Sequence, residues 1–385
     1  MRSILAKRRR RRLVATLAAV TLLVAACGDG DEPDEPDEQA EATEEPTDEP
    51  TETETDTEAE AEEEAEEPEE VEITHSIDLP GVISYELNLP TLVADANGFL
   101  AAEGIEIANY VTGSGGTLRQ AVIAGEYGVG LFATVHPVLA RSGGSPWKAV
   151  FSAHDKEIFS LIVRADIADE VQSVEDLAGR RVGFSTPGAG SWFIGGALLQ
   201  GAGLNPDTDL EYVSIGGDPA VIYTALQEGQ VDAFSSWEPT TTRAIADGIA
   251  VPLVPIYEDA VHEEFIGPSA LSMVLIATED QIAEDPEFVQ SLVDAHMRAM
   301  EWIADADSEE IAELVIGHPN TAQMFDGLDA DLVVQMIDNI RGGFGTGCLD
   351  PDGYQTELDI LLEYEVVEAE VPFEEFADTT FAGQC

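Results

Sequence analysis

Two short segments rich in glycine, serine and threonine carry the residue types best suited to binding an anion or another acceptor-rich ligand. One is Gly113-Ser114-Gly115-Gly116-Thr117, and the other is Thr186-Pro187-Gly188-Ala189-Gly190-Ser191. Each follows an apolar run and opens a helical pattern. Each is therefore predicted to expose unpaired backbone N–H groups and the positive end of a helix dipole. An ordinary connection between a strand and a helix is the alternative.

Side chains beyond the ends of predicted strands extend this candidate site. His136 lies just past one strand, where it serves either a ligand or a structural hydrogen bond. Trp237 follows another strand and, with Tyr85, is suited to form an aromatic wall, while Glu238 either joins it or begins a helix. The residues predicted to bind the ligand are Tyr85, Ser114, Gly116, Thr117, Thr134, His136, Ser185, Thr186, Gly188, Gly190, Ser191, Trp237 and Glu238.

The sequence holds few signals of catalysis or metal binding. Its six histidines, at positions 75, 136, 154, 262, 296 and 318, lack metal-ligand spacing. Ser235 and Ser236 do not lie in a G-x-S-x-G elbow, and the chain has no phosphate-binding loop of the GxxxxGKS/T type. We therefore expect no catalytic residue, no metal and no cofactor.

The first 26 residues have the features of an export signal. Arginines at 8–12 precede an apolar run at 13–26, which is too short to span a membrane. The end of this run and the residue after it, Val24-Ala25-Ala26-Cys27, resemble a bacterial lipobox. We expect Cys27 to be lipidated and to anchor the mature chain on the outer face of the cell membrane, after export by the Sec or the twin-arginine route. A plain secretory signal is the alternative.

A strongly acidic segment follows the signal. Residues 28–72 hold 25 of the 77 acidic residues and no lysine or arginine, so they are predicted to form a disordered tether. Binding of a cationic partner is the alternative role. Residues 73–385 hold 52 acidic and 10 basic residues, a net charge of −42. Such a surface repels phosphate and excludes nucleic acid as a partner, and it suits a saline habitat, where salt screens self-repulsion.

Strands are predicted to alternate with helices along residues 73–385. Apolar runs predict strands at 73–77, 105–111, 129–132, 149–152, 159–163, 181–185, 210–215, 230–234 and 271–277. Helices are predicted from Pro90, at 118–124, at 192–202, at 220–228 and after Thr278, with Tyr85 in a loop. This alternation predicts an α/β fold with mainly parallel sheets, in which ligands bind beyond the carboxyl ends of strands.

Four sequence blocks carry a family resemblance. In chain order they are LPTLVADANGFLAAEGIEI, GSGGTLRQAVIAGEYGVGLF, SVEDLAGRRVGF and ALQEGQVDAFSSWEP. Together they resemble the type II periplasmic solute-binding proteins of ABC transporters, and more narrowly the group that binds nitrate, sulfonates, taurine and thiamine precursors. The resemblance covers about residues 73–340. An extended loop at 78–89 and a longer C-terminus depart from it.

The resemblance implies two doubly wound α/β lobes joined by two crossover strands, with the ligand between the lobes. Lobe 1 is predicted to contain residues 73–164 and 271–385, and lobe 2 residues 165–270. The crossover strands are expected near 161–164 and 271–277.

The function implied is that of a monomeric receptor that captures a small solute and delivers it to an ABC permease. An enzyme on the same fold, making a thiamine pyrimidine or menaquinone precursor, is the alternative. The export signal argues against it, because those enzymes use intracellular metabolites. A regulator's effector domain would need a DNA-binding module. The solute is either a small oxyanion or a flat heterocycle, and Arg119 is the cation nearest to the candidate turns.

Two cysteines remain after Cys27. Cys348 and Cys385 are predicted to form a disulfide, because exported chains meet oxidising conditions. The bond would hold the C-terminal extension in place and has no catalytic part.

Overall fold

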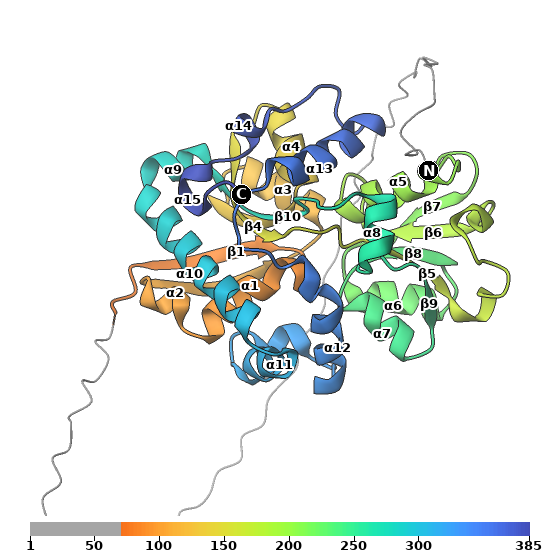
Figure 1. Ribbon diagram of the computed structural model, residues 1–385, viewed down its shortest axis with the longest axis horizontal. Coiled ribbons are helices and arrows are strands. Elements are labelled where there is room, and N and C mark those ends of the chain that lie inside the picture. Colours follow the sequence, from red (N-terminus) through yellow and green to blue (C-terminus); the bar gives the residue numbers. More distant parts are fainter. Residues whose placement is uncertain (1–70) are drawn as a thin grey trace, which may run out of the picture. The chain divides into compact units, whose positions relative to one another are not determined.

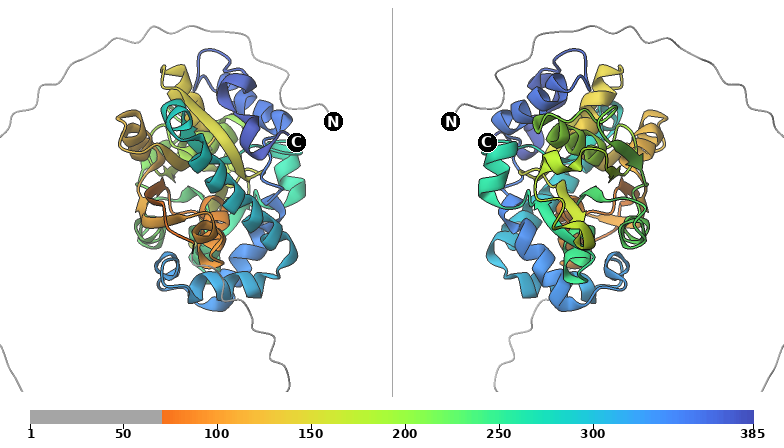
Figure 2. Two further views of the ribbon diagram at one scale, coloured as in Figure 1. Left: turned by 90° about the vertical axis from the view of Figure 1, so that its left-hand side faces the viewer. Right: turned by 90° about the vertical axis from the view of Figure 1, so that its right-hand side faces the viewer.

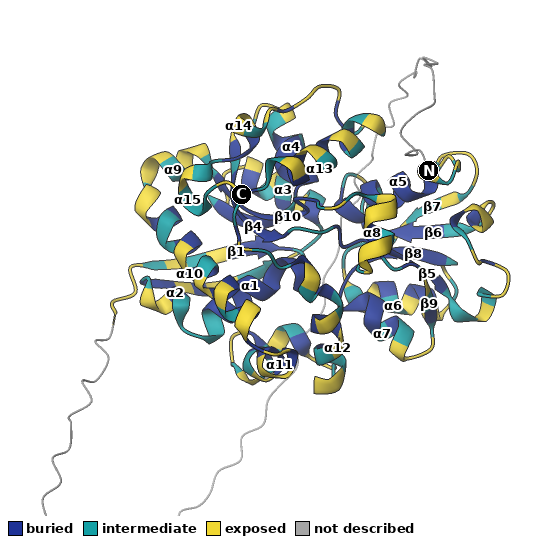
Figure 3. Cartoon of the chain, viewed as in Figure 1, coloured by how far each residue is buried: buried dark blue, intermediate teal, exposed yellow. Residues whose placement is uncertain are grey.

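The computed structural model describes residues 71–385, which contain three β-sheets surrounded by helices (Figure 1). The export signal, Cys27 and nearly all of the acidic segment lie outside the described residues. From residue 71 onward, no helix is long and apolar enough to cross a membrane. The strands are mostly buried, and the exposed residues lie on the helices and loops around them (Figure 3).

Two sheets lie close together. The first pairs β1 (His75–Gly81) in parallel with β2 (Ile105–Thr112). In the second, β10 (Met273–Thr278) runs antiparallel between β3 (Val129–Ala133) and β4 (Trp147–His154). Strand β1 also contacts β3, so the two sheets share one core.

The third sheet has five strands in the order β7-β6-β8-β5-β9. Strand β6 (Arg181–Phe184) is parallel to β7 (Glu211–Ser214) and to β8 (Ala233–Ser236). Strand β5 (Ser160–Arg164) is antiparallel to β8 and to β9 (Ala250–Val254). The fold is therefore of the predicted α/β class, and the strands that run against the others are β5 and β10.

The chain passes twice between the third sheet and the second. Strand β4 belongs to the three-stranded sheet and β5 to the five-stranded one, so the first connection is 155–159. The return runs from the end of β9 to the start of β10, residues 255–272. The crossovers expected at 161–164 and 271–277 thus lie largely in paired strands, each next to a connection.

The helices fill the intervals between strands. Their bounds are α1 Tyr85–Ala96, α2 Phe99–Ala102, α3 Gly115–Ile123, α4 Val135–Ser142, α5 Gly190–Gly201, α6 Pro219–Gln227, α7 Thr240–Ala246, α8 Asp259–Phe265, α9 Glu279–Glu284, α10 Pro286–Asp305, α11 Ser308–Gly317, α12 Ala330–Ile340, α13 Pro351–Glu363, α14 Phe373–Phe376 and α15 Thr379–Ala382. Short 3₁₀ turns are η1 Ala165–Ile167, η2 Val174–Leu177, η3 Ala322–Phe325 and η4 Arg341–Gly343.

Helix α1 begins earlier than the sequence predicts. Ser84 caps it by accepting a hydrogen bond from the Leu87 N–H, so the helix starts at Tyr85, and Pro90 lies inside it. An interior proline costs about 3 kcal/mol, which the nearly complete burial of the helix offsets. The extended loop predicted at 78–89 is wrong, because β1 and α1 occupy most of it. The sequence predicts a helix start at Pro90, whereas the Ser84 cap sets the start at Tyr85.

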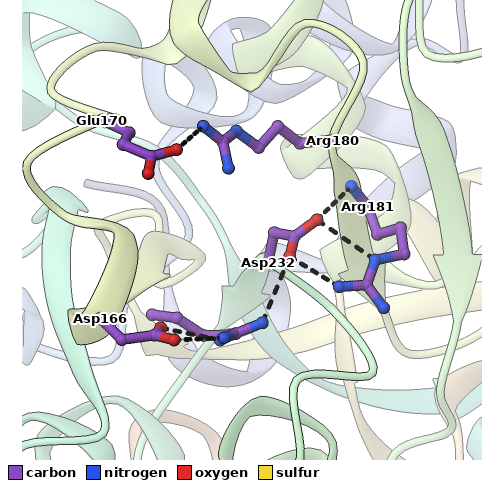
Figure 4. A network of polar contacts seen from close by, with 6 residues as sticks. Asp166, Glu170, Arg180, Arg181 and Asp232 are labelled. Atoms are coloured by element: carbon purple, nitrogen blue, oxygen red, sulfur yellow. Dashed lines mark hydrogen bonds and ion pairs between the residues drawn. The ribbon is translucent and has the colours of Figure 1, made fainter.

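A network of ion pairs links the ends of three strands in the five-stranded sheet (Figure 4). Asp232, just before β8, accepts from the backbone N–H of Arg181 at 2.9 Å and from its Nη2 at 2.7 Å. Arg164, at the end of β5, approaches the same carboxylate at 3.4 Å. These contacts hold β5, β6 and β8 together at the end of the sheet where β6 and β8 begin.

The C-terminal extension returns to strand β4. Cys348 and Cys385 form a disulfide with a Cα–Cα distance of 5.5 Å. The Asp378 N–H donates to the Ala149 carbonyl in β4 at 2.9 Å. Helices α13 and α14 lie at the opposite end of the folded part from α11 and α12 (Figures 1 and 2). The extension thus belongs to the core that surrounds the second sheet.

Candidate functional site

A cavity, partly open to solvent, lies where residues of the second and third sheets meet; we call it the main cavity. It is lined by Val82, Ser84, Ser114, Gly115, Leu131, Phe132, Ala133, His136, Ile158, Phe159, Ser185, Ala189, Gly190, Ser191, Gly217, Trp237 and Met273. None of these side chains is an acid, a lysine or an arginine. The wall is apolar and aromatic with a few hydroxyl groups, the usual character of a small-molecule site.

Three aromatic rings form much of this wall. Phe132 comes from β3, Phe159 from the first connection between sheets, and Trp237 from the loop after β8. The ring of Trp237 meets that of Phe159 edge to face, with centroids 5.8 Å apart. Its Nε1 donates to the Ile83 carbonyl at 2.7 Å, which fixes the indole plane. Rings fixed in this way suit a flat ligand.

Three helices begin at the main cavity. Their N-cap residues Ser84, Ser114 and Ala189 precede α1, α3 and α5, and all three line it. The two serines use their hydroxyls to accept the Leu87 and Thr117 N–H groups, each at 3.3 Å. Ala189 has no such side chain. The first N–H groups of α5 therefore lack a side-chain cap and are available to an acceptor on a ligand.

Two serines link the end of β6 to the start of α5. The Ser185 N–H donates to Ser191 Oγ at 3.0 Å, and the two hydroxyls lie 2.7 Å apart. Ser214 Oγ in turn donates to the Ser185 carbonyl at 2.7 Å. These bonds hold the turn at 186–190 against the sheet and place two hydroxyls in the cavity wall.

His136 contributes a neutral imidazole. Burial, and to a smaller extent the nearby Arg119 charge, lower its pKa to about 3. Arg119 Nη1 lies 3.0 Å from His136 Nδ1, and because the guanidinium can only donate, this nitrogen accepts and the proton resides on Nε2. A Cβ on Gly115 would lie 2.2 Å from Nε2, so only glycine fits there.

Arg119 itself does not line the main cavity. It donates to the imidazole and, at 3.3 Å, to the Gly188 carbonyl, and thereby joins α3 to the turn after β6. Arg119, which the sequence predicts to be the cation nearest to the ligand, therefore links the two sheet regions.

The structure brings some of the predicted ligand residues together at the cavity. Those that line it are Ser114, His136, Ser185, Gly190, Ser191 and Trp237. Gly116, Thr117, Thr186 and Gly188 lie in the same two turns without lining it. A Cβ on Gly116 would be 3.6 Å from Thr186 Oγ1, so the two turns approach each other closely.

Tyr85, Thr134 and Glu238 are placed away from the cavity lining. The Tyr85 ring packs on Phe325 at 4.8 Å, and its hydroxyl donates to the Met324 carbonyl. Thr134 Oγ1 donates to the Leu271 carbonyl. The Glu238 carboxyl accepts from the N–H and hydroxyl of Thr242 in α7. Each side chain is buried and bonded, as a structural residue would be.

Several wall residues were not predicted. Ser84 and Gly217 were detectable, because each belongs to a helix start of the kind used for the two chosen turns. Phe159 sits in the connection between sheets, and Leu131, Phe132 and Met273 belong to β3 and β10. Apolar strand residues carry no sequence mark that separates a cavity wall from the core.

The chain matches a known family over most of its folded part. Residues 88–310 match the family described as NMT1/THI5 like. The chain belongs to the NMT1/THI5-like family. This confirms the resemblance carried by the four sequence blocks at the level of the family.

Individual relatives are more distant. The riboflavin-binding protein RibY of Chloroflexus aurantiacus is 26% identical over 244 residues, which cover 62% of this chain and 64% of RibY. A solved structure from Bordetella bronchiseptica has 23% identity and a TM-score of 0.70, covering 80% of this chain and 95% of its own. The aliphatic sulphonate-binding protein SsuA of Escherichia coli has 18% identity and a TM-score of 0.59, covering 80% and 99%.

This NMT1/THI5-like chain also shares its fold with an enzyme. The desulfurization enzyme DSZB is 20% identical, with a TM-score of 0.55, and the match covers 80% of this chain and 97% of that one. These structural likenesses show the type II periplasmic binding protein fold, which confirms the predicted fold class. They leave function to be argued from the site.

Proposed function

We propose that this protein is a lipid-anchored solute-binding protein of an ABC importer, which captures a small neutral heterocycle in the main cavity and delivers it to a permease. The observation that carries the proposal is the cavity wall, with three aromatic rings, four serines, a neutral histidine and no charged side chain. Rings stack on a flat solute, while the hydroxyls and the uncapped start of α5 bind its polar atoms.

The relatives support a binding protein. RibY is named for riboflavin, a flat ring system with carbonyl acceptors, which has the chemistry that this wall suits. The E. coli neighbour is a sulphonate-binding protein, so a small oxyanion at the α5 N-terminus is the second candidate solute. In this cavity such an anion would have no arginine or lysine to pair with, because Arg119 is bonded elsewhere.

An enzyme of the DSZB kind would need a reactive group at the cavity. Among the lining residues the structure describes, His136 has the one ionisable side chain, and burial beside Arg119 holds its pKa far below the ordinary value, so the imidazole is neutral near pH 7. No thiol or carboxyl lines the wall. This composition supports binding over catalysis.

Calorimetry of the purified chain with riboflavin, a substituted pyrimidine, taurine and nitrate tests the solute class. We expect saturable binding of a heterocycle, and loss of that binding in folded Trp237→Ala, with Trp302→Ala in α10 as the matched control. Tighter binding of taurine or nitrate than of either heterocycle would overturn the heterocycle while leaving a solute receptor. Turnover of a bound heterocycle to a new product would overturn the receptor.

Closure around the solute is part of the same proposal. Lobe 1 would contain residues 73–164 and 271–385 and lobe 2 residues 165–270, with 155–159 and 255–272 as the hinge connections. A ligand that binds the closed form better shifts the population toward it. We expect X-ray scattering to show a smaller radius of gyration at saturating solute. An unchanged radius would contradict a hinge.

The anchor is tested separately. Mass spectrometry of the membrane fraction should show an acylated Cys27 at the mature N-terminus, and Cys27→Ser should move the protein into the soluble fraction. Recovery of unmodified protein cleaved at another position would contradict lipidation.

A further inference from the structure

A second pocket lies beside the first connection between the sheets. It is lined by Glu86, His154, Lys156, Glu157, Ile158, Tyr257, Asn339, Ile340, Gly342 and Gly343. Ile158 lines both this pocket and the main cavity, so both lie beside the connection 155–159. Unlike the main cavity, this second pocket has carboxyl groups in its wall.

One carboxyl oxygen of Glu157, in this wall, lacks a hydrogen-bond partner, whereas the backbone N–H groups of Ile158 and Phe159 interact with the same carboxyl. Its side chain is 97% removed from solvent, since the residue is 3% exposed, and its Oε2 has no hydrogen-bond partner among residues 71–385. The Glu157 N–H donates to His262 Nε2 at 2.8 Å, which fixes the backbone at this point. Burying a carboxyl oxygen without a donor is unfavourable, so a donor that occupies the pocket would be bound.

Other buried carboxyl groups surround this oxygen. Glu86 is buried in the same wall, where burial raises its pKa to about 7, and it accepts from Ser84 Oγ at 2.6 Å and from the Glu238 N–H at 3.0 Å. Burial likewise raises the pKa of Glu157. Glu357 of α13 is buried beside them; burial, and then the Glu157 charge, raise its pKa, and its Oε1 also lacks a partner.

The positive groups of the wall are already bonded. Lys156 Nζ pairs with Asp259 at the surface. His154 places Nδ1 at 2.9 Å from the Lys156 carbonyl and Nε2 at 3.0 Å from the Ile340 carbonyl. Neither group can move to Glu157 without breaking these contacts. Two buried carboxyl oxygens, Glu157 Oε2 and Glu357 Oε1, therefore remain without a hydrogen-bond partner or a paired cation among residues 71–385.

We propose that the second pocket is a binding site for a small organic cation with N–H donors, a primary ammonium or guanidinium group bound by Glu157 Oε2. Residues 71–385 contain no cluster of three or more His, Cys, Asp or Glu side chains arranged to hold a metal, and both nitrogens of His154 are engaged. Tyr257 also lines the pocket, and an aromatic side chain is suited to lie near an organic cation.

Binding of such a cation would exchange with protons. The carboxyls of an empty pocket retain protons to a higher pH than free carboxyls, and an ammonium group replaces that proton with a charge-assisted hydrogen bond. The affinity should therefore rise with pH. Because Glu86 bonds to both Ser84 and the Glu238 N–H, an occupant beside Glu86 also acts on the contact between the sheet regions.

Titration calorimetry of the full chain with ethylammonium chloride tests the proposal, with tetramethylammonium, which has no N–H, as the matched ligand. We expect saturable binding of ethylammonium alone, with tighter binding at pH 8.5 than at pH 6, and proton release detected by comparing two buffers. Glu157→Gln should weaken binding about tenfold or more, because hydrogen bonds to charged groups contribute about 1.5–3 kcal/mol. Glu363→Gln, exposed on α13, should not change it.

A proton shared between Glu157 and Glu357 is the competing account of the two free oxygens. It predicts no saturable ethylammonium binding at pH 8.5 and no proton release, and that result would overturn the proposal. Unchanged affinity in folded Glu157→Gln would overturn it too. If this variant does not fold, the number of protons that the unaltered protein releases on binding ethylammonium still distinguishes the two accounts. Trp237→Ala should still bind ethylammonium but no longer bind the heterocycle. The second-pocket proposal and the proposed solute-binding function can therefore be contradicted independently.

Discussion

The indole Nε1 of Trp237 donates a hydrogen bond of 2.7 Å to the main-chain carbonyl of Ile83. Two further bonds join the same segments, from the Tyr85 N–H to the Glu238 carbonyl and from the Glu238 N–H to the Glu86 carboxyl. Trp237 follows β8 of the five-stranded sheet, and Ile83 lies between β1 and α1. The aromatic wall of the main cavity is therefore also a tie between the two sheet regions.

Trp237→Phe removes that tie and keeps an aromatic ring. We expect affinity for the solute to fall by about 1–2 kcal/mol, because one hydrogen bond is lost and the Ile83 carbonyl is left buried without it. Calorimetry measures the change, and Trp302→Phe in α10 is the control. If folded Trp237→Phe binds as tightly as the unaltered protein, the tie plays no part in binding.

Arg119→Ala should accelerate release of the solute. The substitution removes the contacts of α3 with His136 and with the Gly188 carbonyl, which hold the two turns together. The pKa of His136 should rise, since the Arg119 charge helps to lower it, yet it should stay below its ordinary value because burial is the larger cause. Stopped-flow dissociation and NMR titration measure these effects, with Arg298→Ala as control. Equal rates of solute dissociation from Arg119→Ala and from the unaltered protein would show that these contacts do not slow release.

Gly190 and Gly116, one in each turn, should differ in how well they tolerate replacement by alanine. A Cβ at position 190 would lie 2.5 Å from Phe159 Cε2, whereas at position 116 it would meet Thr186 Oγ1 at 3.6 Å. We expect Gly190→Ala to destabilise the fold by about 1–3 kcal/mol through overpacking, and Gly116→Ala to change stability little. Denaturant melts compare the pair. Equal stabilities would show that Phe159 can move away.

Stability should decrease as pH rises from 6.5 to 8. Burial raises the pKa of Glu86 to about 7 and that of Glu238 to about 8, and it also raises those of Glu157 and Glu357, so the folded chain holds protons that the unfolded chain has lost. Each such proton lowers the unfolding free energy by about 1.4 kcal/mol per pH unit across that range.

The buried histidines act at lower pH and with the opposite sign. Burial lowers the pKa of His136, His154 and His296, so their destabilising effect grows only as pH falls below about 6.5. Denaturant melts between pH 6.5 and 8 thus isolate the carboxyls. Glu238→Gln should flatten the dependence. A slope that is unchanged in that variant would assign the effect to other groups.

Reduction of the disulfide should destabilise the C-terminal extension. Cys348 and Cys385 are separated by 37 positions, for which loop closure gives a contribution of about 3–4 kcal/mol. We expect the double variant Cys348→Ser, Cys385→Ser to melt at a lower temperature than the unaltered protein. Reductant should lower the melting temperature of the unaltered protein and leave that of the variant unchanged. A melt insensitive to reductant in the unaltered protein would contradict this contribution.

The sequence by itself determined the α/β class, the family and the two small-residue turns that begin α3 and α5. These features depend on local patterns, such as apolar runs, glycines and cap residues, that act over a few positions. Even there, local signals compete. Pro90 suggested a helix start, while Ser84 provides the cap and burial of α1 overcomes the cost of the proline.

Only the tertiary structure decided which side chains reach the main cavity. Whether Trp237 or Tyr85 faces the cavity depends on how the two sheet regions meet, and they meet with Trp237 in the wall and Tyr85 packed against Phe325. Arg119 is near the turn in sequence, yet its long side chain reaches across to Gly188. Such choices rest on contacts between residues far apart in the chain, and the local residue pattern carries no record of them.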